Sequence, residues 1–304
     1  MILIITHKED YTADYIINKL NNKKISYFRL NCEDIPKYNF SIDSSLNFNI
    51  NGIDKFKSVW FRRTKLFDFK NFSLEEQEFL INEYDSFLKN LFSIISTDKW
   101  LSNPKNIYSA ENKLLQLQYA KSIGFNIPKT IISTNPNQIR DFYFSHNEKI
   151  ILKPFWNSKL FQNNKTKLLF TNLVDKKHID DLDNMEITPI IFQEYIEKKI
   201  EYRITVVEDE IFVASVDSQK NEKTKIDWRR DNSKFQKDKI PKEIENKCLE
   251  LVKMLGLKFG AIDLIQDEYD NFYFLEINAN GQWVWIESDT GLTISDSIIN
   301  FLNA

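Results

Sequence analysis

Three oxygen-bearing side chains near the C-terminus interrupt runs that are otherwise apolar and strand-like. Asp263 interrupts "FGAIDLIQ", and Glu276 and Asn278 interrupt "NFYFLEIN". The polar stretch "DEYDN" between the runs suits a hairpin turn, and a turn centred between Tyr269 and Asp270 places Asp263 directly opposite Glu276. Glu276 and Asn278 are two residues apart, so they share one face of their strand. The spacing therefore predicts that three oxygen ligands converge on one face of a hairpin.

The two facing carboxylates need a counter-charge, because like charges directly opposite each other destabilise a sheet. A hard divalent cation between them makes the arrangement favourable, and an all-oxygen ligand set suits Mg²⁺. We therefore predict a metal site formed by Asp263, Glu276 and Asn278. A solvated polar face of the hairpin is the alternative.

The composition indicates a folded protein of two or three lobes. The chain has 304 residues, of which 42% are hydrophobic and 14% aromatic, which argues against a disordered chain. The net charge of -3 gives no basic surface for nucleic acid. No stretch approaches the roughly 20 apolar residues that span a bilayer, and the opening "MILIITHKED" is typical of a first strand. We expect a soluble, cytoplasmic protein with no nucleic-acid or membrane partner.

The cysteines and histidines suit neither redox nor hydrolytic chemistry. Cys32 and Cys248 lie far apart in the sequence and form no metal or redox motif, which favours a reduced compartment. His7, His146 and His178 are scattered and have no serine or cysteine motif to activate. No "GxGxxG" follows the first strand, and no "GxxxxGK[ST]" occurs. The sequence therefore favours a mechanism without a protein nucleophile.

The first hundred residues predict an open α/β domain. The segments "ILIIT", "TADYIINKLNNKKI" and "SYFRLN" are typical of strand, helix and strand, and "KSVWFRR" predicts another strand that ends in two arginines. A long helix is predicted over residues 73–95, with Ser73 suited to its N-terminus. We end this N-terminal α/β domain at residue 100.

Two further lobes are expected, over residues 101–190 and 191–304. Residues 102–124 predict one helix closed by Gly124. The remainder is mostly β, interrupted by a helix over residues 241–257. The fold class expected from these elements is α/β (α+β).

From about residue 105 to its C-terminus the chain resembles the ATP-grasp superfamily of carboxylate–amine ligases. The resemblance is carried, in order, by "ENKLLQLQYAKSIGFNIPKT", "ILKPF", "FQEYIEKKIEYRITVV" and the paired "AIDLI" and "FLEINANGQW". The stretches "VWFRR", "DWRRD" and "NGQWVWIESDTGLTIS" are similar to the graspetide synthetases, microviridin-type maturases that install side-chain esters or amides in ribosomal peptides. The resemblance implies an ATP-grasp fold that holds ATP between two lobes, preceded by an N-terminal α/β domain.

The resemblance also implies which residues bind the nucleotide. Lys153 leaves its strand with a positive charge suited to phosphate oxygens, and Lys113 would be the second nucleotide lysine. Solvated surface lysines are the alternative for both. Glu201 would be the ribose partner.

The stretch "FQEYI" would form the hinge between the lobes. Its main chain would bind the adenine, and the side chain of Gln193 or Glu194 would help. The predicted set is Gln193, Glu194, Tyr195 and Ile196. An ordinary strand end is the alternative.

Two arginines suit phosphoryl chemistry. Arginine stays charged and offers a bidentate fork for charge that develops on a phosphoryl group. We predict this catalytic role for Arg203 in "EYRITVV" and Arg229 in "DWRRD", with a simple ion pair as the alternative. Arg62 and Arg63 would bind peptide carboxylates or form a surface pair.

One segment departs from the family pattern. Many relatives cover the phosphates with a glycine-rich loop, but "KPFWNSKLFQNNKTKLLF" contains no glycine. Close approach of the backbone to phosphates is harder without glycine. Lys159, Lys165 and Lys167 would supply positive charge there instead.

Two tryptophans follow the metal ligands. Trp283 and Trp285 are alternate residues, which share a face if the strand continues. Aromatic side chains are common peptide anchors, and core packing is the alternative. Together with an N-terminal domain that ATP handling does not need, they favour a peptide substrate.

We predict an ATP- and Mg²⁺-dependent ligase that acts on a ribosomal precursor peptide with a leader and a core segment. The resemblance implies that Asp or Glu side chains are activated as acyl phosphates and joined to Ser/Thr hydroxyls or Lys amines, which gives a macrocycle. A ligase that adds free amino acids to a protein or small metabolite is one alternative, and a non-catalytic ATP-binding module is another. The oligomeric state stays open, with a homodimer as one form.

Overall fold

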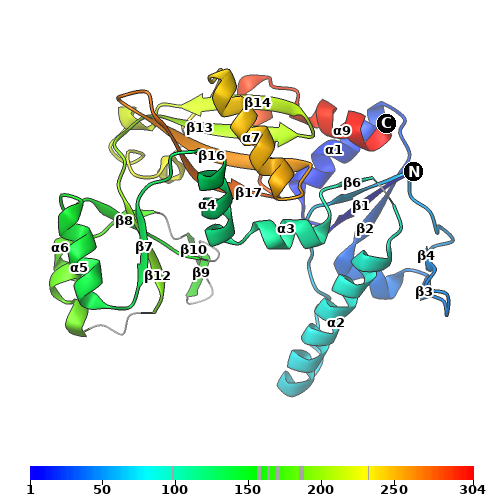
Figure 1. Cartoon of the computed structure of the whole chain (residues 1–304). Helices are drawn as coiled ribbons and strands as arrows, with labels where there is room; N and C mark the ends of the chain where they lie inside the picture. The colour runs from blue at the N-terminus through cyan, green and yellow to red at the C-terminus, as the bar shows by residue number, and fades with distance from the viewer. Residues whose placement is uncertain (98, 156–158, 163–164, 169–170, 185–187, 232) are drawn as a thin grey trace.

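The computed structural model describes residues 1–97, 99–155, 159–162, 165–168, 171–184, 188–231 and 233–304, and it describes the side chains of all these except 159–168. Three sheets of four or five strands organise this part of the chain (Figure 1). They follow one another along the sequence as an N-terminal sheet, a middle sheet and a large sheet. The cleft described below lies where elements of all three meet.

The N-terminal sheet is parallel, with strand order β2-β1-β5-β6. Its elements are β1 (Ile2–Thr6), α1 (Tyr11–Asn22), β2 (Tyr27–Asn31), η1 (Cys32–Lys37), β5 (Ser58–Phe61), α2 (Leu74–Ile94) and β6 (Trp100–Leu101), with a small hairpin of β3 (Phe40–Ile42) and β4 (Phe48–Ile50). The predicted strand–helix–strand opening is confirmed. The predicted start of the long helix is confirmed too, because Ser73 and Glu76 form a capping box there.

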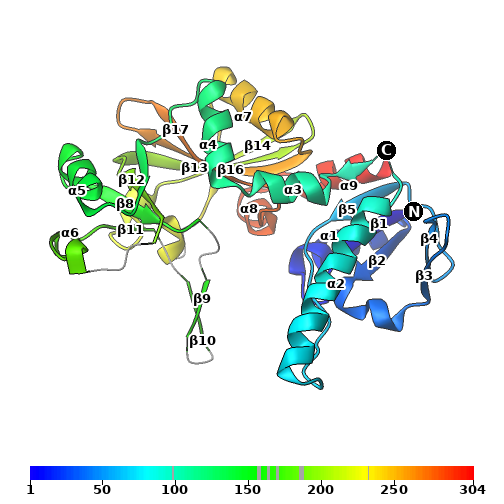
Figure 2. The same ribbon diagram turned by 60° about the horizontal axis from the view of Figure 1, so that its bottom comes forward.

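The middle sheet has the strand order β11-β8-β12-β7 and is antiparallel. Its elements are β7 (Thr130–Ser133), α5 (Pro136–Ser145), β8 (Ile150–Lys153), β11 (Asn172–Leu173), α6 (Lys176–Asp180), η2 (Leu182–Asn184) and β12 (Ile190–Glu194). A hairpin of β9 (Lys159–Gln162) and β10 (Lys165–Leu168) projects away from the sheets (Figure 2). The three lysines expected to supply charge, Lys159, Lys165 and Lys167, lie in this hairpin, outside the residues whose side chains are described.

The large sheet is antiparallel, with strand order β15-β14-β13-β16-β17. Its elements are β13 (Lys198–Val207), β14 (Glu210–Val216), η3 (Ser218–Lys220), η4 (Trp228–Arg230), β15 (Gln236–Lys237), α7 (Lys242–Met254), β16 (Phe259–Asp267) and β17 (Phe272–Asn278). Tyr202, Ile204 and Val206 of β13 share a core with buried residues of α7. Arg203 lies between them in the sequence and therefore points to the opposite face of the sheet.

The C-terminal helices join the large sheet to the N-terminal sheet. They are α8 (Val284–Thr290) and α9 (Ile294–Asn303). Ile298 of α9 belongs to a buried core that also contains Ile4 of β1 and Phe212 of β14. The Ser58 hydroxyl donates to the Leu302 carbonyl oxygen at 2.6 Å. The end of the chain therefore packs against the beginning.

Two expectations about secondary structure are wrong. The single helix expected over residues 102–124 is two helices, α3 (Pro104–Ala110) and α4 (Lys113–Ser122). The break occurs because the Asn112 side chain caps α4 by accepting from the amides of Leu114 and Leu115.

The expected strand through both tryptophans ends at Asn278. Trp283 precedes α8 and Trp285 lies in it, so they are not alternate residues of a strand.

The division into residues 1–100, 101–190 and 191–304 stays a proposal, and the sheets favour one adjustment. Strand β12 begins at Ile190 and pairs with β7 and β8, so we place the boundary between the later lobes after Glu194. Within the described ranges, no helix has the length and apolarity needed to cross a membrane.

Candidate active site

A cleft of about 1010 Å³ opens between the middle and large sheets. Strands β8, β12, β13, β16 and β17 line it, together with residues 61–64 of the N-terminal domain. It brings together all twelve residues predicted for the nucleotide, the metal and catalysis: Lys113, Lys153, Gln193, Glu194, Tyr195, Ile196, Glu201, Arg203, Arg229, Asp263, Glu276 and Asn278. The structure thus places the predicted site residues in one cavity, although they span more than half of the sequence.

The facing arrangement of Asp263 and Glu276 is confirmed, but the turn alone does not produce it. The pairs nearest the turn, such as Gln266 with Phe272, are centred on Tyr269 and not between Tyr269 and Asp270. A bulge at Leu275 then shifts the register by one residue and brings Asp263 opposite Glu276. The predicted pairing is therefore right, whereas the predicted turn centre is half a residue wrong.

Each carboxylate lies beside a cation. Arg203 Nη1 donates to both oxygens of Asp263, at 2.8 and 2.9 Å. Lys113 Nζ lies 3.6 Å from Glu276 Oε2. Asn278 Nδ2 donates to Asp263 Oδ2 at 3.2 Å and to Glu276 Oε1 at 3.4 Å, so it contacts both other predicted ligands. Arg203 therefore forms the ion pair of the alternative interpretation, and its partner is one of the predicted metal ligands.

The cleft shifts the pKa values of the two carboxylates in opposite directions. Burial raises the pKa of Asp263 to about 6; the charge of Glu276 adds to this effect, and the Arg203 guanidinium offsets part of it. Burial opposes ionisation of Glu276 as well, but the ammonium groups of Lys113 and Lys153 hold its pKa below the ordinary value. Asp263 is thus the member of the pair whose charge most needs another cation.

The donor set fits Mg²⁺. Mg²⁺ is commonly held by one or two carboxylates together with the phosphates of a substrate. Two carboxylates and one amide meet here, and among the residues whose positions are described no group of three acidic, histidine or cysteine side chains is placed to hold a metal. A ligand role for Asn278 requires its amide to turn, because the nitrogen now faces the carboxylates. Mg²⁺ held here would therefore need phosphate oxygens to complete its coordination.

Two lysines make the neighbouring part of the cleft positive. Burial lowers the pKa of Lys153 to about 8; the charge of Lys113 adds to this effect, and Glu276 offsets only part of it. Lys113 Nζ donates to the carbonyl oxygen of Pro154 at 3.0 Å, which keeps the two lysines close. An anionic group in this part of the cleft would raise the pKa of Lys153 again. These contacts fit the phosphate role that the resemblance implies.

Lys153→Ala is expected to weaken ATP binding by about 1.5–3 kcal/mol, which is the value of a hydrogen bond to a charged group. Isothermal titration calorimetry of the purified protein measures the change. Lys149→Ala is the matched control, because Lys149 is an exposed lysine next to the hinge that pairs with Glu197. Unchanged ATP affinity of Lys153→Ala would contradict the phosphate assignment.

The two hinge side chains differ in whether they have an unpaired acceptor for the adenine base. Gln193 is 2% exposed; its Nε2 donates to Thr130 Oγ1 at 3.0 Å, and its Oε1 has no hydrogen-bond partner within the described ranges. A buried orphan acceptor that lines the cleft fits the amino group of adenine. Glu194 instead accepts from the Lys129 amide at 2.7 Å. Of the two side chains expected to help, Gln193 is the one that the geometry favours.

Some backbone amides of the hinge already form hydrogen bonds with segments of the middle lobe. The amides of Glu194 and Tyr195 donate to the carbonyl oxygens of Lys129 and Lys149. A main-chain donor to adenine would therefore have to come from Ile196.

Sequence reasoning missed Lys198. Its Nζ donates to Glu201 Oε1 at 2.8 Å, and both side chains are almost fully buried in the wall of the cleft. Residues three apart in a regular strand point to opposite faces, but a bulge between Lys198 and Ile200 places these two on the same face. A ribose hydroxyl would therefore meet Glu201 as half of an ion pair.

The remaining arginines differ from one another. Arg229 donates to Asp227 through Nε at 2.8 Å and Nη2 at 2.6 Å, so it forms the ion pair of the alternative interpretation, and it also lines the cleft. Its catalytic role stays a prediction. Arg63 is exposed at the rim of the cleft. Arg62 is only 1% exposed, so the expected surface pair is wrong. Its burial follows from its place directly after the central strand β5.

The tryptophans have separate places. Trp283 is fully buried, which agrees with the core alternative. Trp285 lines the cleft, and its ring lies 5.1 Å from that of Trp228 and 4.8 Å from that of Phe235. These three rings, which we call the aromatic wall, stand next to Arg229.

Comparison with known proteins gives a consistent result. Residues 110–302 match the model of the RimK-like ATP-grasp domain. A RiPP-associated ATP-grasp ligase of Chryseobacterium gregarium, solved with ADP and a leader and core peptide, is 29% identical, with a TM-score of 0.89 over 99% of this chain and 96% of that one. A macrocyclase of Microcystis aeruginosa MRC, solved with its precursor peptide, is 27% identical, with a TM-score of 0.87 over 100% and 99%. The tetrahydromethanopterin:alpha-L-glutamate ligase of Methanocaldococcus jannaschii is 22% identical over 97% of this chain and 96% of that ligase.

Proposed function

The chain belongs to the family of RimK-like ATP-grasp domains and is an ATP-dependent ligase, and from this premise we propose that it closes rings in a ribosomal precursor peptide. The observation that carries the proposal is the extent of the likeness to two solved peptide ligases. It covers the N-terminal domain, which nucleotide binding does not require, as well as the cleft. The substrate carboxyl groups are those of Asp or Glu side chains.

Nucleotide binding falls to residues from both sides of the cleft. Lys153 and Lys113 bind the phosphates, the hinge with Gln193 holds the adenine, and Glu201 contacts the ribose. Asp263, Glu276 and Asn278 would hold Mg²⁺ together with phosphate oxygens. When bound, Mg²⁺ withdraws negative charge from the phosphoryl group.

The chemistry needs two displacements. An oxygen of the peptide carboxylate attacks the γ-phosphorus, ADP leaves, and an acyl phosphate forms. A hydroxyl or amine of the same peptide then attacks the acyl carbon, loses its proton and releases phosphate, so that an ester or amide bond closes the ring. Arg203 and Arg229 carry permanent positive charge at the place where negative charge develops. Holding both peptide groups together in the cleft converts the second step into an intramolecular reaction.

The aromatic wall is the proposed contact for the core segment of the peptide. Trp228 and Trp285 are half-buried, Phe235 is buried against them, and all three border the cleft, so they offer an apolar surface beside the charged centre. Aromatic groups of this kind bury much area at low entropic cost. Arg63 at the rim adds a charge for acidic side chains. We place the leader segment outside the cleft, because the core must reach Asp263.

The decisive experiment mixes the purified protein with ATP, Mg²⁺ and the short peptide encoded beside its gene. Mass spectrometry should show the loss of one water for each link, and the product should resist proteolysis as a ring does. Omission of ATP or Mg²⁺ is the control, and either omission should leave the mass unchanged. A gain of the mass of one amino acid, when glutamate or another free amino acid is added, would favour the amino-acid ligase. An unmodified peptide under conditions in which ATP binds would favour the non-catalytic module.

Two further features are proposals. The buried free thiols of Cys32 and Cys248 suit a reducing compartment, so we place the protein in the cytoplasm. Leu74 and Phe79 on α2 are 79% and 64% exposed, which supports a homodimer that covers this helix. Light scattering of the purified protein at several concentrations measures the oligomeric state.

A further inference from the structure

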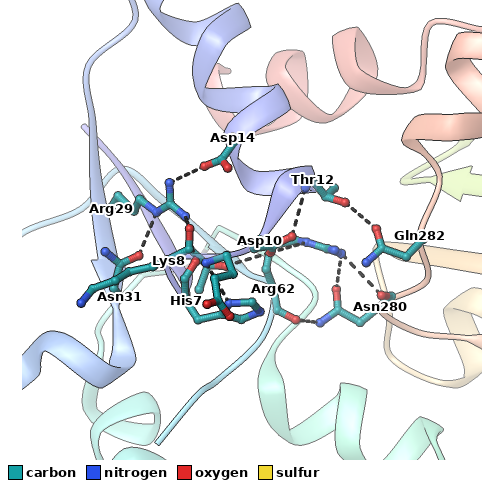
Figure 3. Close-up of polar contacts among 12 residues, drawn as sticks. His7, Lys8, Asp10, Thr12, Asp14, Arg29, Asn31, Arg62, Asn280 and Gln282 are labelled. Carbon is teal, nitrogen blue, oxygen red and sulfur yellow. Dashed lines mark hydrogen bonds and ion pairs between the residues drawn. The ribbon is translucent and has the colours of Figure 1, made fainter. Parts of the chain in front are cut away.

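Residues of the N-terminal domain form hydrogen bonds with the loop that follows the predicted metal ligands. This loop, residues 279–282, runs from the end of β17 to α8 (Figure 3). Arg62 Nη1 donates to Asn280 Oδ1 at 2.8 Å and to the Asn280 carbonyl oxygen at 3.4 Å. In return, the Asn280 side-chain amide donates to the Arg62 carbonyl oxygen. The contact is therefore reciprocal and joins two residues that lie 218 positions apart.

Two residues at the start of α1 add to this contact: one binds Arg62, and the other binds the loop. Asp10 caps α1 and accepts from Arg62 Nε at 3.4 Å and from Thr6 Oγ1 at 2.8 Å. Thr12 Oγ1 donates to Gln282 Oε1 at 2.5 Å. The N-terminal domain therefore holds the 279–282 loop at Asn280 and at Gln282 (Figure 3).

The same loop touches residues of the reaction centre. The carbonyl oxygen of Gln282 accepts from Arg203 Nη2 at 3.2 Å. Gly281 packs so closely that a Cβ at this position would lie 2.7 Å from Arg203 Nη2 and 3.1 Å from the Cβ of Asn278. The position of the loop thus sets where the Arg203 guanidinium and the Asn278 side chain can lie.

Stability alone does not account for Arg62. Its guanidinium is fully buried, and Nη2 finds no partner among the residues that the structure places. Burial lowers the pKa of Arg62, and the carboxylate of Asp10 offsets only part of this effect. A buried ion pair is often no more stabilising than apolar residues of similar size, because both charges lose their hydration. A packed apolar contact would join the domains at lower cost, but it would not set the direction of the loop.

We propose that Arg62 and Asn280 are positioning residues of the ligase: they hold the 279–282 loop so that Arg203 and Asn278 face the phosphates. The N-terminal domain is then part of the reaction centre and not only a platform for the peptide. The expected effect on turnover rests on the proposed function. The effect on the position of the loop can be measured without any peptide.

Asn280→Ala tests the proposal in the full-length protein, with Ser58→Ala as the matched control. Ser58 also makes a buried hydrogen bond between the N-terminal domain and the C-terminal segment, but it bonds to Leu302 in α9 and not to the loop. Hydrogen exchange should become faster at the amides of residues 279–283 in Asn280→Ala and stay unchanged there in Ser58→Ala. The Mg²⁺ concentration that half-saturates ADP binding should rise at least about fivefold in Asn280→Ala, while ADP affinity measured in EDTA stays within about twofold.

Turnover gives a third measurement with the peptide encoded beside the gene. The kcat of Asn280→Ala should fall at least about tenfold with little change in the KM for ATP, and Asn280→Asp, which keeps an oxygen for Arg62, should recover part of it. Unchanged exchange and unchanged Mg²⁺ dependence in Asn280→Ala would overturn the proposal, as would equal losses in Ser58→Ala. If the parental protein modifies no peptide, the proposed function fails, and the exchange and Mg²⁺ results still decide the role of Asn280.

Discussion

Asp263→Asn and Glu276→Gln are each expected to lower peptide-dependent ATP turnover by about 10²-fold or more while the protein stays folded. Each change removes one negative charge from the pair that we propose holds Mg²⁺. Metal-assisted charge stabilisation contributes several kcal/mol to such reactions, and each 1.36 kcal/mol corresponds to a factor of ten in rate. The fold should persist because an amide keeps the shape of each side chain, and the amide in Asp263→Asn keeps one oxygen that accepts from Arg203.

Glu268→Gln is the matched control for these variants. Glu268 lies in the turn of the same hairpin, is exposed and does not line the cleft, so its turnover should equal that of the parental protein. Release of ADP measures turnover, and circular dichroism with a thermal melt checks the fold. Near-normal ATP consumption by either Asp263→Asn or Glu276→Gln would remove the metal assignment.

Arg203→Ala is expected to lower the rate by about 10²–10³-fold, the usual cost of removing a preorganised group that stabilises transition-state charge. The affinity for ATP should change much less, because the charge that Arg203 meets develops only during phosphoryl transfer. Calorimetry for ATP binding and single-turnover measurements with the peptide separate the two effects. A loss of binding with no loss of rate would assign Arg203 to the ground state.

The buried position of Arg203 requires two additional variants. Arg203 is 7% exposed and pairs with Asp263, so its loss leaves a carboxylate without its partner, and some loss of stability is expected. Arg203→Lys keeps the charge but not the fork, and it should retain the fold with a reduced rate. Arg140→Ala removes an arginine that pairs with Asp183 outside the cleft and should leave the rate unchanged. Effects of Arg203 and Asp263 variants should not add, because the two side chains are in contact.

Local patterns in the sequence predicted most of the secondary structure and the family. Alternation and helical spacing identified β1, α1 and β2, and the Ser73 cap located the start of α2. The expected ATP-grasp fold is confirmed. The single helix expected over residues 102–124 was wrong because α3 ends at Ala110 and the Asn112 side chain caps the start of a second helix. Spacing alone does not reveal such a break, since both segments keep the same apolar character.

Some features of the candidate site could likewise be predicted from the sequence, and others could not. The sequence by itself determined that Asp263 and Glu276 lie on the two strands of one hairpin, since two apolar runs flank a polar turn. Only the tertiary structure decided the exact register, because the bulge at Leu275 compensates for a turn centred on Tyr269. A bulge likewise decided that Lys198 and Glu201 share a face. Bulges depend on how a whole sheet twists and packs, so a period of two residues cannot predict them.

The burial of Arg62 and its contact with Asn280 were also decided by tertiary structure alone. The sequence determined that two arginines follow a strand, and charge by itself predicts that such residues lie in water. The chain brings α9 back onto the N-terminal sheet, and this packing places the 279–282 loop over Arg62. Residues so distant in the sequence meet only when the whole core has formed, because their contact depends on burial that no local segment can provide.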